Sequence, residues 1–361
     1  MISPRLLEAA QCPDCAGTLA LAGECARCAG CGRAFDARGG VLDLRPLETF
    51  EAQTKYLDPA LHADARHESI APPLLGSKIR NDRLRSWLRP AAGDRIVDLG
   101  CGSGRTLMWN AASGADMIGV DVSRFFAHEA IASLGLIVGD LRRLPLRTGA
   151  FTKAWSLDVL EHLTPADVRA MLREAQRVLQ DDGALFVYTH VRQNGWIAGG
   201  TRLVNRFARW CERAGLIDLR QERLRKSDHL NPIANHDELR RIVRDAGFEL
   251  ERIVYYTPIV GAFVENVLIR IAERLMVRRA DGDSTSGAHA GGPHPGPPSV
   301  HHDDAAARAR AAARARLARR GPAFYALSLL TVAMKIDLLL FGRLQSGPFF
   351  ALLRKAPVAR G

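Results

Sequence analysis

Five cysteines lie within the first 31 residues, in the stretches "QCPDCAG" and "ECARCAGCGRAF". A structural zinc ion takes four thiolates, and two CxxC turns supply them together with backbone N–H groups directed at sulfur. Two such turns use four of the five cysteines: Cys12, Cys15, Cys28 and Cys31. Gly32 follows the last of them, where a tight turn favours glycine. The alternative set uses Cys25 in place of Cys31 and lacks the following glycine. We expect the first set to hold a structural zinc ion.

A second group of reactive residue types surrounds the stretch "RIVDLGCGSGR" at 95–105. Its apolar residues predict a strand that ends near Asp98, and three glycines precede the helical run that follows: Gly100, Gly102 and Gly104. Glycines at a strand-to-helix turn let the main chain approach a ligand closely. Two later apolar runs also end in a carboxylate, Asp121 in "IGVDVS" and Asp140 in "VGD".

Histidines form the third group, since imidazole is the usual general base near neutral pH. His162 follows Glu161 in the segment after the fourth expected strand, and His190 ends the fifth. Glu161 and His162 fit equally well as a helix-start pair that braces a loop. For His229 and His236, which flank "LNPIAN", we expect surface or packing roles. A reaction at a carbon atom or a soft nucleophile needs no general base. Reactions with and without a base therefore both stay open.

The elements that must position these residues are short strands alternating with helices. Between 94 and 191 the apolar runs are "RIVDLG", "MIGVDV", "LIVGD", "FTKAWSL" and "ALFVYTH". Such alternation predicts parallel βαβ units and a three-layer α/β domain. The later stretch "HDELRRIVRDAGFELERIVYYTP" adds a helix, a glycine stop and a further strand, and "PFFALLRKAP" adds a last one.

The pattern DxGxGxG at 98–104 resembles motif I of the class I S-adenosylmethionine-dependent methyltransferases. "LPLRTGAFTKAWSLDVLEHL" and "EAQRVLQDDGALFVYTH" resemble further stretches of that family, so 94–191 is similar from end to end, most of all to the methyltransferase type 11 group. The resemblance implies a Rossmann-like α/β fold with a seven-stranded sheet whose last strand is antiparallel. It also implies a transferase (EC 2.1.1.-) that uses S-adenosyl-L-methionine.

The resemblance further implies roles for single residues. The glycine loop passes beneath the methionine portion of the cofactor, Asp121 accepts the ribose hydroxyls, and Asp140 contacts the adenine amino group. The expected cofactor-binding residues are Asp98, Gly100, Cys101, Gly102, Gly104, Asp121, Val122, Asp140, Leu141 and Leu157. The expected catalytic residues are Glu161, His162 and His190. The alternative, another nucleotide-binding domain in which Asp121 contacts an NAD ribose, gives "DVLEHL" and Asp140 no role.

Composition shifts suggest the domain boundaries. We expect these units: a zinc-ribbon-like module at 1–45, a connecting helical region at 46–93, a methyltransferase domain at 94–257 and 348–358, a substrate-side insertion at 192–234, and a helical insertion before the last strand at 258–347. Residues 281–304, rich in Gly, Pro and His, predict a disordered linker inside the last insertion.

Charge and hydropathy bear on the partners. The net charge of +11 favours an anionic partner, although an Arg- and Ala-rich composition also follows from a GC-rich genome. An amphipathic helix at 259–279 precedes an apolar segment at 322–341, which Lys335 and Asp337 interrupt. We expect a lid or an interfacial patch, with the arginines of 305–320 favouring anionic headgroups. The alternative is that the two helices pack on each other over the domain.

These features rank the possible classes of methyl acceptor. A small-molecule or lipid-like acceptor comes first, RNA (rRNA or tRNA) second and protein third. The ribbon and "AFDARGGVLDL" are similar to the zinc-bearing N-terminus of certain bacterial methyltransferases, including ribosomal RNA guanine methyltransferases, in which the front module helps to capture substrate. A non-catalytic, cofactor-binding partner subunit is the remaining alternative. "MISPRLLEAA" lacks the apolar run of a signal peptide, so we expect a cytoplasmic protein with a peripheral contact at the inner membrane face through 258–345.

Overall fold

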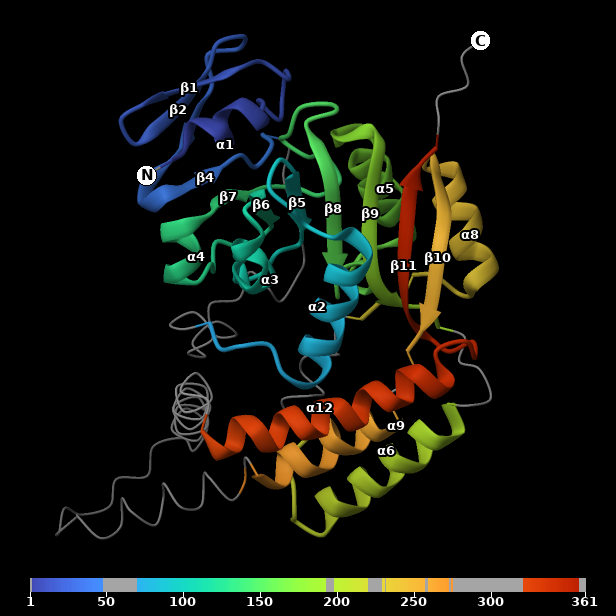
Figure 1. The fold of residues 1–361 in the computed structure, drawn as a ribbon. Helices are drawn as coiled ribbons and strands as arrows, with labels where there is room; N and C mark the ends of the chain where they lie inside the picture. The colour runs from blue at the N-terminus through green and yellow to red at the C-terminus, as the bar shows by residue number, and fades with distance from the viewer. Residues whose placement is uncertain are drawn as a thin grey trace, which may run out of the picture.

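The computed structural model of the 361-residue chain describes residues 2–47, 70–192, 198–219, 229–230, 232–256, 259–272, 274 and 321–356. A central sheet lies between a small ribbon at one side and a layer of helices at the other (Figure 1). The predicted linker at 281–304 and the Ala/Arg tract at 305–320 lie outside the described residues.

The central sheet has the order β10-β11-β9-β8-β5-β6-β7-β4. Its strands are β4 (Val41–Asp43), β5 (Arg95–Leu99), β6 (Asp116–Asp121), β7 (Gly135–Val138), β8 (Phe151–Leu157), β9 (Leu179–His190), β10 (Phe248–Tyr255) and β11 (Pro348–Lys355). All neighbouring pairs are parallel except the two that involve β11, which runs antiparallel to β9 and to β10. The predicted Rossmann-like α/β sheet with an antiparallel last strand is therefore confirmed.

The sheet has eight strands where seven were expected, because β4 joins it from the N-terminal segment. Val41 is paired with Leu136 in a parallel register, and the N–H of Leu44 donates to the carbonyl of Val138 at 2.8 Å. Without β4, β7 would present an edge of unpaired N–H and C=O groups. The end of the ribbon segment thus closes the edge of the larger sheet.

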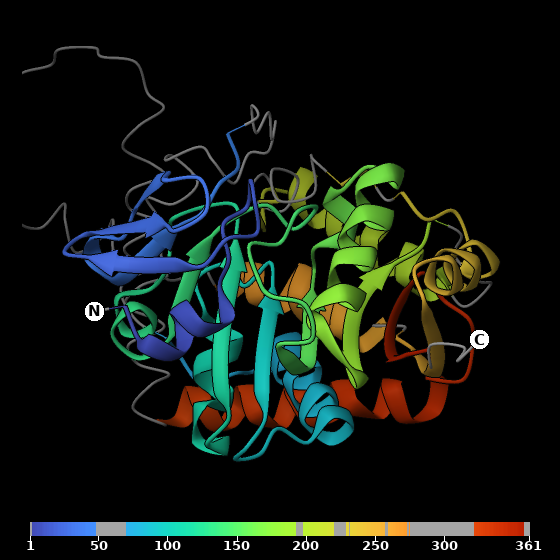
Figure 2. The ribbon, with the colours of Figure 1, turned by 90° about the horizontal axis from the view of Figure 1, so that it is seen from above.

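Helices cover both faces of this sheet. They are α1 (Pro4–Ala9), α2 (Leu75–Leu88), α3 (Arg105–Asn110), α4 (His128–Ser133), α5 (Pro165–Val178), α6 (Ala198–Arg213), α8 (His236–Asp245), α9 (Ile259–Phe263) and α12 (Pro322–Phe341), with short 3₁₀ turns η1 (Arg38–Gly40), η5 (Ala111–Ser113) and η6 (Leu160–His162) and the π-helical turn η7 (Val264–Leu268). Neighbouring strand residues such as Ile96 and Val97 belong to different buried clusters, as the two-residue strand period requires. Residues of α2 and α12 share one cluster, and those of α5 and α8 share the other (Figure 2).

The N-terminal ribbon consists of β1 (Leu19–Ala22), β2 (Cys25–Cys28) and β3 (Ala34–Asp36), paired antiparallel. It is anchored on the segment that follows β7, where the N–H of Gln11 donates to the carbonyl of Pro145 at 3.0 Å. Arg124, three residues beyond β6, also forms an ion pair with Asp36 at 2.7 Å. The ribbon is therefore packed on the segments that follow β6 and β7.

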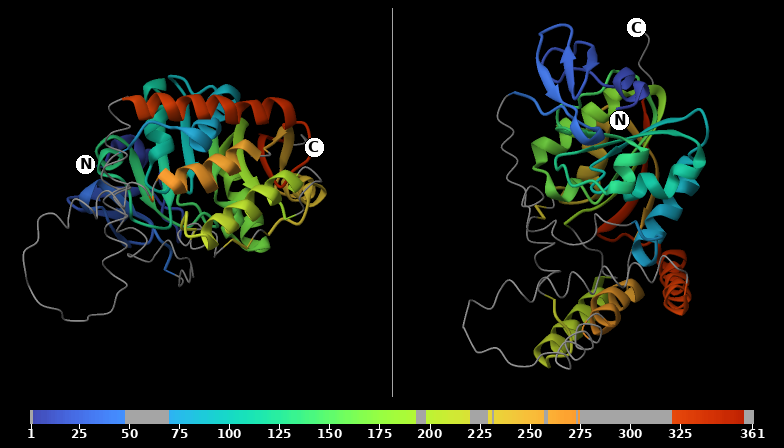
Figure 3. Two further views of the ribbon diagram at one scale, coloured as in Figure 1. Left: turned by 90° about the horizontal axis from the view of Figure 1, so that it is seen from below. Right: turned by 90° about the vertical axis from the view of Figure 1, so that its left-hand side faces the viewer.

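A layer of α6, α9 and α12 lies at the opposite side of the molecule from the ribbon, beyond the carboxyl end of β10 (Figures 1 and 3). The N–H of Tyr255, the last residue of β10, donates to the carbonyl of Gly342, directly after α12. Among the described residues, α9 contacts both α6 and α12. The predicted apolar helix 322–341 is thus present and is packed against the domain, although expectations about 275–279 lie outside the described residues.

Candidate functional site

The four predicted cysteines converge in the ribbon, with all their sulfur atoms within 4.8 Å of one another. Cys12 and Cys31 approach to 3.7 Å between Sγ atoms, and Cys15 and Cys28 to 3.4 Å. Cys25 lies outside the cluster, as the spacing argument expects. Four thiols in this arrangement match the donor set of a structural zinc site.

The main chain around the sulfurs is built to leave them room. A Cβ on Gly17 would lie 2.7 Å from the Sγ of Cys28, so a larger residue does not fit there. The N–H groups of Gly30 and Cys31 donate to the Sγ of Cys28 at 3.3 and 3.5 Å. The bond from Cys31 is the first of the causes that lower the pKa of Cys28 to about 6, which favours its thiolate, whereas burial raises the pKa of Cys12.

The glycine loop follows β5 and turns into α3. Gly100 has φ +83° and a Cβ there would lie 2.4 Å from a methyl carbon of Val159. A Cβ on Gly104, also at φ +83°, would lie 2.8 Å from that of Ala130. Gly102, at φ +54°, has no neighbouring atom within 4 Å of such a Cβ. The outer two glycines are therefore required by packing, whereas Gly102 faces open space where a ligand can approach the main chain.

Two of the predicted acids lie beside this loop, at the ends of adjacent strands. Asp121 ends β6, and its carboxylate accepts hydrogen bonds from the N–H of Gly102 at 2.8 Å and from the N–H and hydroxyl of Ser123, both at 2.9 Å. A carboxylate has about four lone-pair positions, so acceptance of two ribose hydroxyls would require the Ser123 hydroxyl to rotate away. Asp98 is buried in β5, and burial, together with the Asp121 charge, raises the pKa of Asp98 to about 8.

The third predicted acid, Asp140, follows β7 and is engaged by Arg142. The Arg142 guanidinium donates to both carboxylate oxygens at 2.9 to 3.0 Å, and the Arg142 N–H donates at 2.8 Å. The predicted contact with adenine would therefore have to share a carboxylate that already has a cationic partner. Leu141 beside it and Leu157 at the end of β8 are half-buried, as is Val122 after β6, while Cys101 is buried.

The predicted catalytic residues meet at the carboxyl ends of β8 and β9. Glu161 in η6 is 1% exposed, and the hydroxyl of Thr189 donates to its Oε2 at 2.8 Å. His190 ends β9 with its Nε2 3.8 Å from Oε1 of Glu161. Burial raises the pKa of Glu161 to about 8, and the nearby Asp158 carboxylate adds to the shift. A buried carboxyl beside an imidazole is an arrangement that can hold and pass a proton.

His229 joins this group, although the sequence suggested only a surface or packing role for it. The ring centroids of His229 and His162 are 4.7 Å apart, and those of His229 and His190 are 5.5 Å apart. Nothing in the local sequence distinguishes His229, because its neighbours come from other strands. His236, by contrast, is buried and its ring nitrogen lies 2.9 Å from the carbonyl of Ser346, which agrees with the expected packing role.

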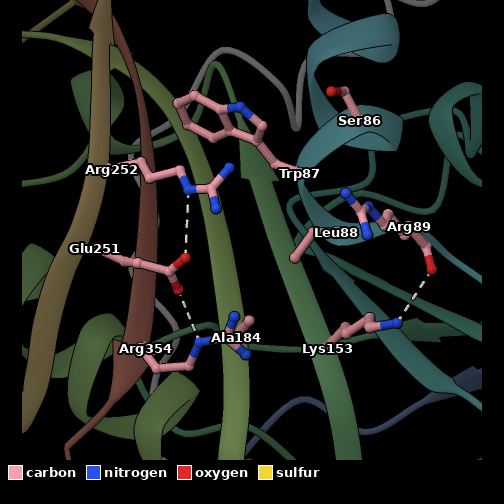
Figure 4. A pocket seen from close by; sticks show the side chains of 9 residues that line it. All are labelled: Ser86, Trp87, Leu88, Arg89, Lys153, Ala184, Glu251, Arg252 and Arg354. Atoms are coloured by element: carbon pink, nitrogen blue, oxygen red, sulfur yellow. Dashed lines mark hydrogen bonds and ion pairs between the residues drawn. The ribbon is translucent and has the colours of Figure 1, made fainter.

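A pocket of ≈ 340 Å³ lies elsewhere, beside β8, β9, β10 and β11 (Figure 4). The polar side chains that line it interact with other lining residues. Glu251 forms ion pairs with Arg354 at 2.9 Å and with Arg252 at 3.3 Å, and Lys153 donates to the carbonyl of Arg89 at 3.2 Å. None of the predicted site residues lines it. We therefore assign the candidate site to the loops after β5 to β9 and not to this pocket.

Comparison with known proteins identifies the family of the domain that holds this candidate site. Residues 97–187, from β5 to β9, match the methyltransferase domain family. The chain carries a class I S-adenosylmethionine-dependent methyltransferase domain. This methyltransferase domain holds Asp98, Asp121, Asp140 and Glu161, and His190 lies just beyond the matched residues.

Individual relatives are matched over only part of their length. The chain is 30% identical over 129 residues to methyltransferase GfsG of Streptomyces halstedii, a match that covers 33% of this chain and 46% of that protein. It is 36% identical over 109 residues to the ubiquinone biosynthesis O-methyltransferase of Azorhizobium caulinodans, which covers 28% and 42%. A solved structure of phosphoethanolamine N-methyltransferase 2 from Haemonchus contortus aligns with 90% of this chain and 62% of that chain, at 14% identity and a TM-score of 0.48. The chain thus spans less than half of the two curated relatives named here.

Proposed function

We propose that this protein transfers a methyl group from S-adenosylmethionine to a small, lipid-like acceptor. The glycine loop carries the proposal for the cofactor, because Gly102 presents open main chain next to Asp121. When bound, S-adenosylmethionine supplies a sulfonium methyl group that is already activated for attack. The task of the protein is then to align the acceptor and to exclude water.

A matched pair of glycine variants tests the cofactor assignment. Gly102 and Gly149 both have positive φ, +54° and +65°, and at neither residue does any atom lie within 4 Å of the position that a Cβ would take. Gly102→Arg should abolish S-adenosylmethionine binding in calorimetry, whereas Gly149→Arg, outside the glycine loop, should leave it unchanged. The two substitutions cause similar backbone strain, so a difference in binding reports on the loop. Equal affinity in both variants would overturn the assignment, and binding of NAD in place of S-adenosylmethionine would support the other nucleotide-binding class.

We also propose that the cysteine cluster holds a structural zinc ion. Four sulfurs within 4.8 Å, and the room left by Gly17, support this assignment. The Cys28→Ala, Cys31→Ala double variant should lose the metal, whereas Cys25→Ala, which removes the spare thiol of the same ribbon, should keep one zinc per chain in metal analysis. Full retention of zinc by the double variant would contradict the proposal.

The proposal for a lipid-like acceptor rests on the outer face of α12. Large apolar side chains spaced three and four residues apart are exposed along it: Tyr325, Leu329, Val332, Ile336, Leu339 and Leu340. Successive residues of a helix are 100° apart, so these six fall within roughly 100° of the helix surface. A continuous exposed stripe of this kind favours a membrane or partner contact over open solvent.

The inner face of α12 explains why the helix should lie on a membrane and not cross it. By length and mean hydropathy of 1.8, Pro322–Phe341 qualifies as a candidate membrane span. Yet Lys335 forms an ion pair with Asp82 of α2, Thr331 accepts a hydrogen bond from the N–H of Leu75 at 2.8 Å, and Asp337 accepts one from the N–H of Val260 at 2.7 Å. Insertion across a bilayer would break all three contacts, at several kcal/mol in total.

Charge in the same layer favours an anionic surface. The exposed positions of α6 include four arginines, at i, i+4, i+7 and i+11: Arg202, Arg206, Arg209 and Arg213. Beside them, Phe207 and Trp210 are exposed and stacked, with ring centroids 5.7 Å apart. Arginines next to exposed aromatic rings are typical of helices that lie in the headgroup region. We therefore propose a peripheral contact with the inner membrane face, from which a lipid-like acceptor enters.

Vesicle co-sedimentation tests the membrane contact. The wild-type chain should bind anionic vesicles, and the Leu329→Glu, Ile336→Glu double variant should bind at least about tenfold less, because two apolar contacts are lost. Leu47→Glu is the control, since Leu47 is as exposed as Leu329, at 72%, but lies in the ribbon segment. Equal binding by all three chains would contradict the contact.

Transfer of radiolabelled methyl groups in a cell extract then identifies the acceptor class. Label in the organic phase, insensitive to nuclease, supports the proposal. Nuclease-sensitive label would support the RNA alternative instead, and cofactor binding without any labelled product would support a non-catalytic partner subunit.

A further inference from the structure

We propose that Glu161, His162 and His229 form a second metal site, for a divalent first-row transition-metal ion, at the acceptor end of the methyltransferase domain. One donor atom from each of the three residues lies within 4.8 Å of the other two. The site is distinct from the cysteine cluster, which offers thiolates only. Its use in methyl transfer rests on the proposed function, whereas its occupation by a metal does not.

The three donors reach one point because of the strand order. Glu161 and His162 lie in η6, just after β8, and β9 is the parallel neighbour of β8. Carboxyl ends of parallel neighbours meet at one edge, so the η6 donors and His190 at the end of β9 come together there. His229 approaches from between α6 and α8 and places its ring against both His162 and His190.

The donor set has the chemistry of a metal site with open positions. Two imidazoles and one carboxylate suit Fe²⁺, Zn²⁺, Co²⁺ or Mn²⁺, in contrast to the four thiolates of the ribbon. The hydroxyl of Thr189 donates to Oε2 of Glu161 at 2.8 Å, which orients the carboxylate and leaves Oε1 toward the histidines. A ligand held by such an outer hydrogen bond is typical of metal sites. The histidines are half-buried, so an ion can enter.

This site would select an acceptor that presents an ionisable oxygen. Coordination of a hydroxyl oxygen to the metal lowers the pKa of that hydroxyl, and the proton passes to solvent. The oxygen lone pair then forms the new C–O bond to the methyl group, while the electron pair of the breaking C–S bond stays on sulfur. The products are the methyl ether and S-adenosylhomocysteine, so the step needs no redox partner.

Cobalt titration of the full chain tests the site. The ribbon is first loaded with zinc, and Co²⁺ is then added. Wild-type protein should bind one further equivalent with the visible absorption of nitrogen and oxygen ligation and without a thiolate-to-cobalt band. Glu161→Gln and His229→Ala should each weaken that binding at least about tenfold. His128→Ala, which removes an exposed imidazole outside the cluster, should bind as the wild type does.

Each outcome decides the proposal. The proposal is overturned if the wild type binds no Co²⁺ beyond the zinc-loaded ribbon, or if Glu161→Gln and His229→Ala bind Co²⁺ as tightly as the wild type does. If a variant fails to fold, X-ray absorption at the cobalt edge of the wild type decides, because imidazole scattering supports the site and its absence refutes it. Calorimetry with S-adenosylmethionine on the same samples separates the two levels. If the wild type binds S-adenosylmethionine but not Co²⁺, only the metal site is refuted. If the wild type does not bind S-adenosylmethionine, the proposed function is refuted.

Discussion

The donor half and the acceptor half of the candidate site are built in different ways. The donor half consists of the glycine loop and the acids at the ends of β5, β6 and β7, all within 43 residues from Asp98 to Asp140. The acceptor half combines Glu161 of η6 with His190 at the end of β9 and with His229, which precedes α8. Contiguous strand–turn–helix units define the first half, whereas long-range packing defines the second.

The difference has a consequence for what mutations should do. In the donor half, the proposed cofactor binding depends on main-chain conformation, because Gly100 and Gly104 adopt φ values that L-residues rarely take. In the acceptor half, the proposed role depends on side chains, because possible ligand atoms of Glu161, His162 and His229 come together from separate segments. Variants in the two halves should therefore separate cofactor binding from turnover.

The largest effect is expected from Gly100→Ala. An alanine here would be strained in the left-handed backbone conformation, and its Cβ would lie 2.4 Å from Val159. The combined cost of about 2–5 kcal/mol corresponds to a loss of roughly 30-fold to more than 1,000-fold in cofactor affinity. Gly93→Ala is the matched control, since Gly93 has φ +92° with no atom within 4 Å. Calorimetry should show weak binding for the first variant only. Similar affinity for both would mean that the loop does not shape the cofactor site.

An effect of comparable size, on turnover and not on cofactor affinity, should appear in the acceptor half alone. Glu161→Gln should lower kcat by about 10²–10⁴, the usual contribution of a proton-transferring or ligating group, while the Kd for S-adenosylmethionine changes little. Thr189→Val, which removes the hydrogen bond to Oε2, should lower kcat less because the carboxylate remains. If Glu161→Gln weakens cofactor binding as much as it slows turnover, the two halves are not separable.

A smaller effect concerns the pH dependence of stability. Native Asp98, with a pKa of about 8, keeps a proton that the unfolded chain releases near its ordinary value of 3.8. Unfolding therefore releases a proton, and stability falls as pH rises from about 4 toward about 8. Asp98→Asn should flatten the change in Tm between about pH 5.5 and about pH 8. An unchanged slope would contradict the raised pKa of Asp98.

The smallest effects should come from the contacts that attach α12. Thr331→Val leaves the buried N–H of Leu75 without its acceptor and should cost about 1–3 kcal/mol in thermal unfolding. Lys335→Ala removes a partly exposed ion pair with Asp82 and should cost about 0–1 kcal/mol. The reverse ranking would show that charge pairing, and not the buried hydrogen bond, holds the layer in place.

Much of the fold, the cysteine cluster and most of the donor half could be predicted from the sequence. The four clustered cysteines, the five parallel strands, the glycine loop and the acids after β6 and β7 all follow from local spacing. The partners of those acids could not be predicted. Ser123 and Arg142 already engage Asp121 and Asp140, and that depends on side-chain conformations that no motif records.

Other features followed from the fold alone. The pairing of β4 with β7 extends the sheet to eight strands because the open edge of β7 needed hydrogen-bond partners. Lys335 and Asp337, which interrupt the apolar run in the sequence, have partners on α2 and α9. Whether a polar residue in such a run is an obstacle or an attachment depends on what the helix packs against.

The sequence by itself determined the fold class, the zinc-type cysteine set and the glycine loop that follows β5. Strand periodicity, glycine conformation and CxxC spacing act over a few residues, and neighbours in the chain are enough to specify them. Only the tertiary structure placed His229 beside Glu161 and turned one face of α12 outward. The contacts that place them join residues 68 positions apart (Glu161 and His229) and 256 positions apart (Leu75 and Thr331). Those contacts depend on how strands and helices pack, which local spacing does not specify.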